Sequence, residues 1–344
     1  IIHYMSEILS EDFKNYFRIV AALNGLFYTH RPKMFKFFPD SDIVKKHFNL
    51  IVCENDTKME NVYPKPGYFN FKNADKFVRF GRKNKKDIRW HTLVWHNQSP
   101  DWIFRNKDGS FVSKEELEAR LKKYIFTIGK RYGDYITSVD VVNECICDKN
   151  FILRDGNDRS LWNQIIGPEY IDKAFFWAKQ AFPKSSLVIN DYNLETVPEK
   201  RQGMYNLLKD LLSRGVPVDT VGLQMHINIE YPPVEQIKET IEMYGQLGLN
   251  VIVTEMEVSI YKDDKETQKT VTEEIQEKLA QRYKELFECF KMEAQKGILK
   301  DVVLWGVTDK FTWKNYFPVP NRKDAPLLFD DEGKEKAAFF AITK

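Results

Sequence analysis

Two carboxylates in this sequence stand where a buried strand is expected to end. Glu255 follows the apolar run at 251–254, and Glu144 closes the run VDVVNE at 139–144. Burying a carboxylate away from water costs free energy unless it is paired, so a carboxylate at such a position suggests either a partner or a function. Other polar or aromatic residues close similar runs, namely Glu54, Asn55, His91, His96, Asn143, Asp191, Gln224, His226, Glu257 and Trp305.

These residue types fit one kind of chemistry if they converge on a common site. Two isolated carboxylates can break a glycosidic bond, because one acid protonates the departing oxygen while the other attacks or activates water. Amides and imidazoles bind sugar hydroxyls, and indole faces stack on pyranose rings. The set therefore predicts a carbohydrate-cleaving site.

The elements that must bring these residues together are eight apolar runs. They lie at 17–23, 50–55, 88–95, 139–144, 186–191, 220–227, 250–258 and 301–307. The runs are continuous rather than alternating, which is typical of parallel strands buried on both faces.

Helical patterns separate the runs, at 73–84, 113–133, 168–182, 199–215, 233–248 and 272–297. Ser113 and Glu116 have the spacing of a capping box, and Pro168 is expected near a helix start. Eight strand-like runs separated by helical patterns predict an α/β protein with a (β/α)8 TIM barrel as a single domain over residues 1–344. Active sites of such barrels lie at the C-terminal ends of the strands, where Glu255 is placed.

Composition excludes several other classes. The 52 basic and 50 acidic residues give a net charge of +2, too small to attract nucleic acid or an anionic membrane. No segment approaches the roughly 18 apolar residues of a membrane span. Cys53, Cys145, Cys147 and Cys289 lack metal-site spacing and are expected to be free thiols. We expect no metal and no cofactor.

Seven motifs, in this order, resemble those of glycoside hydrolase family 10, the (β/α)8 endo-β-1,4-xylanases. They are HFNLIVCENDTK (47–58), HTLVWHNQSPDW (91–102), DVVNE (140–144), INDYN (189–193), GLQMH (222–226), VTEME (253–257) and LWGVTDKFTW (304–313). The resemblance runs from about residue 17 to 342.

The resemblance implies that Glu144 is the general acid/base and Glu255 the nucleophile of a retaining enzyme. Retention implies carboxyl groups about 5–5.5 Å apart and a covalent glycosyl-enzyme intermediate. Glu144 must begin protonated, so we expect its pKa to be raised by poor solvation and by the nearby anion.

The resemblance also implies sugar-binding roles. Asn143 would hold the sugar 2-hydroxyl, and Tyr192 would face the leaving group. Gln224 and His226 would orient Glu255. The cleavage subsite would be lined by His91, Trp95 and Gln98. The next sugar on the non-reducing side would be bound by Glu54, Asn55 and Lys58. An aromatic wall would be formed by Trp305 and Trp313.

The sequence departs from the family pattern at three positions. Glu257 stands where the family has Asp, and we predict that it still hydrogen-bonds His226. Trp90 replaces a Gly, and Val139 replaces a Trp. We interpret this pair as compensating core packing, which requires Trp90 to be buried.

The expected function is endo-acting cleavage of β-1,4-xylan, with xylan and xylo-oligosaccharides as partners. The alternatives are β-1,4-glucan or mixed-linkage cleavage, or a barrel that binds glycans without cutting them. From the function alone we expect a secreted or cell-envelope location, with any signal segment outside this sequence. The sequence does not indicate the tolerated branches or the oligomeric state.

Overall fold

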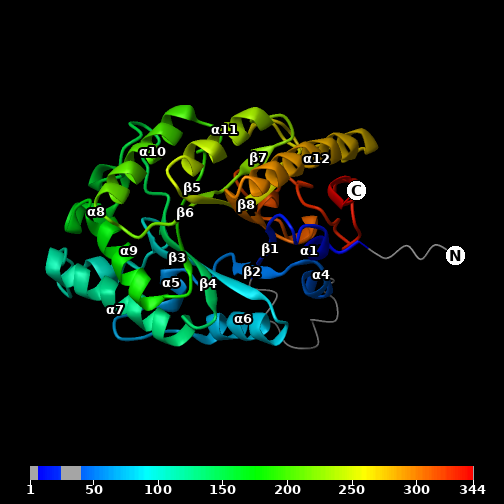
Figure 1. Ribbon diagram of the computed structural model, residues 1–344. Helices are drawn as coiled ribbons and strands as arrows, with labels where there is room; N and C mark the ends of the chain where they lie inside the picture. Colours follow the sequence, from blue (N-terminus) through cyan, green and yellow to red (C-terminus); the bar gives the residue numbers. More distant parts are fainter. Residues whose placement is uncertain (1–6, 25–39, 344) are drawn as a thin grey trace.

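The computed structural model in Figure 1 describes residues 7–24 and 40–343, and its centre is a closed parallel barrel. Eight strands form it: β1 (Arg18–Leu23), β2 (Leu50–Cys53), β3 (Asp87–Trp95), β4 (Ile136–Asn143), β5 (Ser186–Asp191), β6 (Thr220–Leu223), β8 (Asn250–Ser259) and β9 (Leu299–Leu304). Each strand pairs in parallel with the next, and closure comes from the β6–β8 and β9–β1 pairs. The predicted (β/α)8 fold is confirmed.

Helices form an outer ring around the strands in Figure 1. They are α1 (Leu9–Asp12), α4 (Asp40–His47), α5 (Met59–Val62), α6 (Lys72–Lys83), α7 (Lys114–Tyr132), α8 (Leu161–Ile166), α9 (Tyr170–Ala181), α10 (Pro198–Ser213), α11 (Val234–Gly245), α12 (Glu273–Gln295) and α13 (Ala337–Thr343). The barrel strands are almost entirely buried under this ring, as their unbroken apolar runs predict.

Local sequence signals set several helix ends. Ser113 caps α7 by accepting a hydrogen bond from the backbone N–H of Glu116 at 3.1 Å, as the capping-box spacing predicts. Thr272 caps α12 in the same way. Helix α9 begins at Tyr170, two residues later than the predicted start at Pro168.

The predicted strand at 220–227 is wrong as a single element. The chain leaves β6 at Leu223 and pairs again as β7 (His226–Asn228), which lies beside β8. Met225, between them, has a backbone φ of +62°, a conformation that interrupts a strand. The periodicity of apolar residues carries no signal of such a turn.

Trp90 is fully buried in β3 and is the direct register partner of Val139 in β4. Its ring stacks on Tyr132 of α7 at a centroid distance of 5.1 Å. The burial that the packing interpretation requires is therefore present, and the two substituted positions are neighbours.

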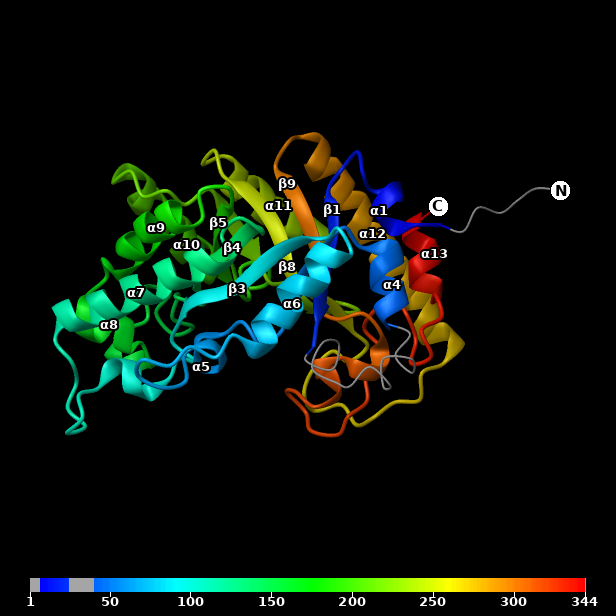
Figure 2. The same cartoon turned by 90° about the horizontal axis from the view of Figure 1, so that it is seen from below.

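The four cysteines are buried and are thiols rather than disulfides, as expected. No helix among the described residues is long and apolar enough to cross a membrane. In Figure 2 the loops that follow β8 and β9 lie together on the lower side of the barrel, the side on which α5 also lies. That side carries the C-terminal ends of the strands.

Candidate active site

A cleft of about 800 Å³ opens at the C-terminal ends of the barrel strands. Both predicted catalytic carboxylates and all twelve predicted sugar-binding residues line it. They are Glu144 and Glu255 with Glu54, Asn55, Lys58, His91, Trp95, Gln98, Asn143, Tyr192, Gln224, His226, Trp305 and Trp313. The lining also includes residues without a predicted role, namely His96, Asn97, Arg159, Asn193, Asp264, Lys314, Phe317 and Pro318.

Glu144 directly follows β4 and adopts a backbone φ of +57°, which is unfavourable for a residue with a side chain. Its backbone N–H is fixed by the carbonyl of Asn190 at 2.8 Å. Its Oε2 accepts weak hydrogen bonds from Asn143 at 3.3 Å and from Gln224 at 3.2 Å. Burial, then the negative charges of Asp191 and Glu255, raise the pKa of Glu144 to about 7. This carboxyl therefore keeps its proton at pH values below about 7.

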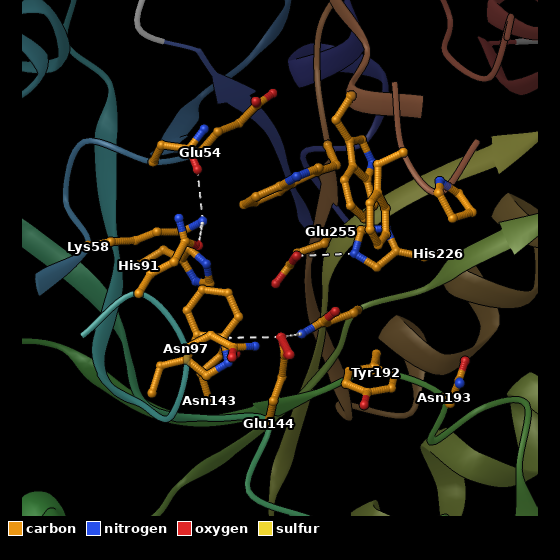
Figure 3. A pocket seen from close by; sticks show the side chains of 18 of the residues that line it. Glu54, Lys58, His91, Asn97, Asn143, Glu144, Tyr192, Asn193, His226 and Glu255 are labelled. Carbon is orange, nitrogen blue, oxygen red and sulfur yellow. Dashed lines mark hydrogen bonds and ion pairs between the residues drawn. The ribbon is translucent and has the colours of Figure 1, made fainter. Parts of the chain in front are cut away.

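Glu255 lies within β8 and faces the same cleft, as Figure 3 shows. Its Oε1 lies 3.1 Å from Nε2 of His226, and its Oε2 accepts a hydrogen bond from Asn190 at 2.9 Å. Burial alone would raise the pKa of Glu255, but hydrogen bonding and positive charge from His226, charge from His91, and the Asn190 bond lower it to about 2. The group is thus ionised where Glu144 is protonated.

His226 is held between two carboxylates. Its Nδ1 lies 3.0 and 2.7 Å from the two oxygens of Glu257, and its Nε2 reaches Glu255. Burial would lower the pKa of His226, but Glu257 and Glu255 raise it to about 10. The predicted Glu257–His226 contact is confirmed despite the longer side chain. Glu257 also accepts a hydrogen bond from the indole N–H of Trp313.

Asn190, at the end of β5, is a site residue that sequence reasoning missed. Its Nδ2 donates to Asn143 at 2.8 Å and to Glu255 at 2.9 Å, while its Oδ1 accepts from Thr254 at 2.6 Å. Gly222 of β6 leaves room for it, since an added Cβ there would lie 2.5 Å from Oδ1 of Asn190. The motif INDYN contains Asn190, but the sequence does not show that this amide, rather than the neighbouring charged Asp191, reaches Glu255.

The role expected for the Gln224 side chain needs correction. Its amide donates to Glu144, whereas Glu255 was the expected partner. Gln224 contacts Glu255 through its backbone alone. The Glu255 N–H donates a 3.0 Å hydrogen bond to the Gln224 carbonyl. The turn at Met225 explains the difference, because it directs residues 224 and 226 to different carboxylates.

Lys58 organises the side of the cleft expected to bind the next sugar. Its Nζ donates to Asn55 at 2.8 Å and Gln98 at 2.7 Å, and lies 5.0 Å from the centre of a Trp95 ring. Burial raises the pKa of Glu54 to about 8, although the nearby Lys58 acts in the opposite direction. The protonated form of Glu54 is therefore favoured near pH 7.

A buried pair of charged residues, Asp140 and Arg89, holds His91 in place, and the sequence did not predict this pair. The Nδ1 of His91 lies 2.8 Å from Asp140, which in turn accepts a hydrogen bond from Arg89 at 2.6 Å. The His91 ring meets Trp305 edge-on at 5.5 Å. Trp313 packs near Trp305 and stacks on Phe317 at 5.0 Å, and both predicted tryptophans line the cleft.

The arrangement combines a protonated carboxyl and an ionised one in a cleft of amides, imidazoles and indoles. Figure 3 shows the Glu144 side chain, at the end of β4, and the Glu255 side chain, from β8, reaching into one space. The described residues contain no group of three or more His, Cys, Asp or Glu that could hold a metal ion.

The chain is similar to known proteins in both sequence and structure. The sequence profile described as Glycosyl hydrolase family 10 matches residues 9–344. Endo-1,4-beta-xylanase A of Caldicellulosiruptor saccharolyticus is 40% identical over 342 residues, which cover 98% of this chain and 95% of that protein. Endo-1,4-beta-xylanase C of Paenibacillus barcinonensis is 41% identical over 314 residues, which cover 88% of this chain but 29% of that longer protein. A solved single-residue variant in complex with xylotriose is 40% identical, with a TM-score of 0.90 and coverage of 98% and 99% of the two chains.

Proposed function

The chain belongs to glycosyl hydrolase family 10, and from this premise we propose that it is an endo-β-1,4-xylanase. It cleaves internal xylosidic bonds of xylan and xylo-oligosaccharides with retention of configuration. The observation that carries the proposal is the opposite shift of two carboxyl pKa values in one cleft, to about 7 for Glu144 and about 2 for Glu255. One acid and one base are thereby available at the same pH.

In the first step Glu255 attacks the anomeric carbon while Glu144 protonates the oxygen of the departing sugar. The product is a covalent xylosyl ester on Glu255. His226 and Asn190 each bind one oxygen of Glu255, which leaves the carboxylate in a fixed orientation for attack. Asn143, beside Glu144, is positioned to bind the sugar 2-hydroxyl, a contact that strengthens in the transition state.

In the second step Glu144 removes a proton from water as the ester is hydrolysed. Esterification removes the negative charge of Glu255, which is one of the causes that raise the pKa of Glu144. The pKa of Glu144 consequently falls in the intermediate, and the group that acted as an acid becomes a base.

The substrate assignment is tested with oligosaccharide pairs. Purified protein is incubated with xylohexaose and with cellohexaose from pH 4 to 8, and initial rates and products are compared. The proposal predicts shorter xylo-oligosaccharides and a much lower rate on cellohexaose. Preference for cellohexaose would support the glucanase alternative, and binding of xylohexaose without cleavage would support a non-catalytic glycan-binding barrel.

We also propose that the enzyme acts outside the cytoplasm or at the cell envelope. Polymeric xylan is too large to cross a membrane intact, so its first cleavage takes place outside. Fractionation of the producing cells followed by immunodetection tests this. Protein confined to the cytoplasmic fraction would contradict it.

A further inference from the structure

A cluster of charged side chains, of which Arg154, Lys200 and Asp191 are buried, adjoins Glu144 and makes no contact with the reacting atoms. It joins the loop after β4 to β5 and α10, and its members are Asp148, Arg154, Asp158, Asp191 and Lys200. Arg154 is 2% exposed, and Lys200 is fully buried. Burying two cations is costly unless their bonds are satisfied, so the arrangement calls for an explanation.

Arg154 connects the proton donor to the leaving-group side of the cleft. Its Nε donates to the backbone carbonyl of Glu144 at 2.7 Å. One of its terminal nitrogens, Nη2, donates to the hydroxyl of Tyr192 at 2.8 Å, and the other, Nη1, to Asp158 at 2.9 Å. A single planar guanidinium therefore fixes the distance between the Glu144 backbone and the end of the Tyr192 ring.

The Glu144 backbone needs such support. Its φ of +57° is a conformation that costs energy for a residue with a side chain. The Asn190 carbonyl binds its N–H, and Arg154 binds its carbonyl oxygen, so both polar groups of this residue are fixed. Without Arg154 the carbonyl side of this strained position would lack its side-chain partner.

Lys200 fixes the Tyr192 ring from the other direction. Its Nζ lies 3.4 Å from the ring centre, 2.9 Å from Asp148 and 3.1 Å from Asp191. The Tyr192 hydroxyl also donates to Asp148. The ring, which lines the cleft, is thus held at its face by Lys200 and at its hydroxyl by Arg154 and Asp148.

We propose that Arg154, supported by Lys200, is a positioning residue that holds Glu144 and Tyr192 as one rigid unit, so that the departing sugar is bound where Glu144 can protonate its oxygen. Arg154 does not touch the reacting atoms and acts through the two residues that it connects. Its contribution is therefore large when the leaving group needs a proton and small when it does not. This inference rests on the proposed function.

The test compares two substrates that differ in the need for protonation. Xylohexaose has a poor leaving group, whereas 2,4-dinitrophenyl β-xylobioside releases a stable phenolate without acid assistance. For Arg154→Lys we expect kcat/KM on xylohexaose to fall about 100-fold and on the aryl xylobioside less than about 3-fold. The parameter kcat/KM is used because it reports only the steps up to formation of the covalent intermediate.

Arg201→Lys is the matched control. Arg201 is also a mostly buried arginine, but its guanidinium binds the backbone carbonyls of Leu194 and Glu195. We expect this variant to change both kcat/KM values by the same factor. If Arg154→Lys also lowers both values equally, or lowers neither, the inference is overturned and Arg154 is merely structural.

Tyr192→Phe keeps the inference testable if Arg154→Lys does not fold. The change removes the hydroxyl bound by Arg154 and keeps the ring. We expect kcat/KM to fall about 10-fold on xylohexaose and less than about 3-fold on the aryl xylobioside. Equal rates of this variant and the unmodified protein on both substrates would overturn the inference. Failure of the unmodified protein to cleave xylohexaose would instead refute the proposed function.

Discussion

Both carboxylate oxygens of Glu257 lie within 3.0 Å of Nδ1 of His226, the imidazole whose other nitrogen reaches Glu255. The same carboxylate accepts the indole N–H of Trp313. One side chain at the base of the cleft therefore orients the histidine beside the nucleophile and one ring of the aromatic wall.

Substitution of Glu257 tests this double role. Glu257→Gln removes the charge that is the main cause of the raised pKa of His226, so we expect that pKa to fall from about 10. Carbon and nitrogen chemical shifts of the imidazole measured by NMR report the change. Because His226 also helps to hold Glu255 ionised, kcat/KM on xylohexaose should fall at least about 10-fold. An unchanged histidine titration would contradict the account.

Glu257→Asp tests the side-chain length separately from the charge. The shorter side chain cannot reach both His226 and Trp313 from the same backbone position. We expect kcat/KM on xylohexaose to fall by about 3- to 10-fold. The Trp fluorescence emission maximum should also shift, because the Trp313 indole loses its hydrogen-bond partner. Full activity with an unchanged spectrum would show that the length at this position is immaterial.

The pH dependence of activity follows from Glu144. The group must carry a proton to act as an acid, and its pKa is about 7. We therefore expect kcat/KM on xylohexaose to be constant between the Glu255 pKa of about 2 and the Glu144 pKa of about 7, and to fall about tenfold per pH unit above the latter. The charge of Asp191 is the second cause of the raised Glu144 pKa, after burial. Asp191→Asn should therefore lower this pKa and shift the alkaline fall of kcat/KM to lower pH.

Asp309→Asn is the control for Asp191→Asn. Asp309 is also a buried carboxylate bonded to a buried lysine, Lys336 at 2.8 Å, but the charge of Asp309 is not among the causes of the Glu144 shift. In Asp309→Asn, kcat/KM should fall at the same alkaline pH as in the unmodified protein. If the alkaline fall of kcat/KM shifts by the same amount in Asp191→Asn and Asp309→Asn, a specific effect of Asp191 is contradicted.

Asn190 should be as important as the residues recognised from sequence. Asn190→Ala removes a hydrogen bond from Glu255 and one from Asn143, so we expect kcat to fall about 100-fold with the fold retained. Gly222→Ala should produce a loss in the same direction, because the new methyl group would displace the Asn190 side chain. Steady-state kinetics and circular dichroism measure both effects, and near-normal kcat in Asn190→Ala would refute the assignment.

The sequence predicted the barrel because its strands are unbroken apolar runs, and this pattern can be recognised without knowledge of tertiary contacts. Polar side chains at the C-terminal ends of parallel strands must converge, which predicted part of the cleft. The roles of its residues, and the inclusion of Lys58, Trp95, Gln98, Tyr192 and Trp313, came from the family resemblance. It could not predict which carboxylate Gln224 binds, since that depends on the backbone turn at Met225. Asn190 and Arg154 were missed because their importance lies in pairs of contacts that join distant segments.

The register pair of Trp90 and Val139 provides a stability test. Trp90→Ala removes a fully buried ring, and we expect it to lower the free energy of unfolding by about 3–5 kcal/mol. If the two positions compensate each other, Trp90→Gly combined with Val139→Trp should be more stable than either single variant. Denaturant unfolding measures all three, and purely additive losses would contradict compensating packing.

The central claim is that Glu255 forms the covalent intermediate while Glu144 acts as the acid. The most direct test is inactivation with 2,4-dinitrophenyl 2-deoxy-2-fluoro-β-xylobioside, followed by protease digestion and mass spectrometry. The account predicts a single fluoroglycosyl adduct on the peptide that contains Glu255 and none in Glu255→Ala. An adduct on any other residue, or turnover without an adduct and with inversion of configuration, would contradict it.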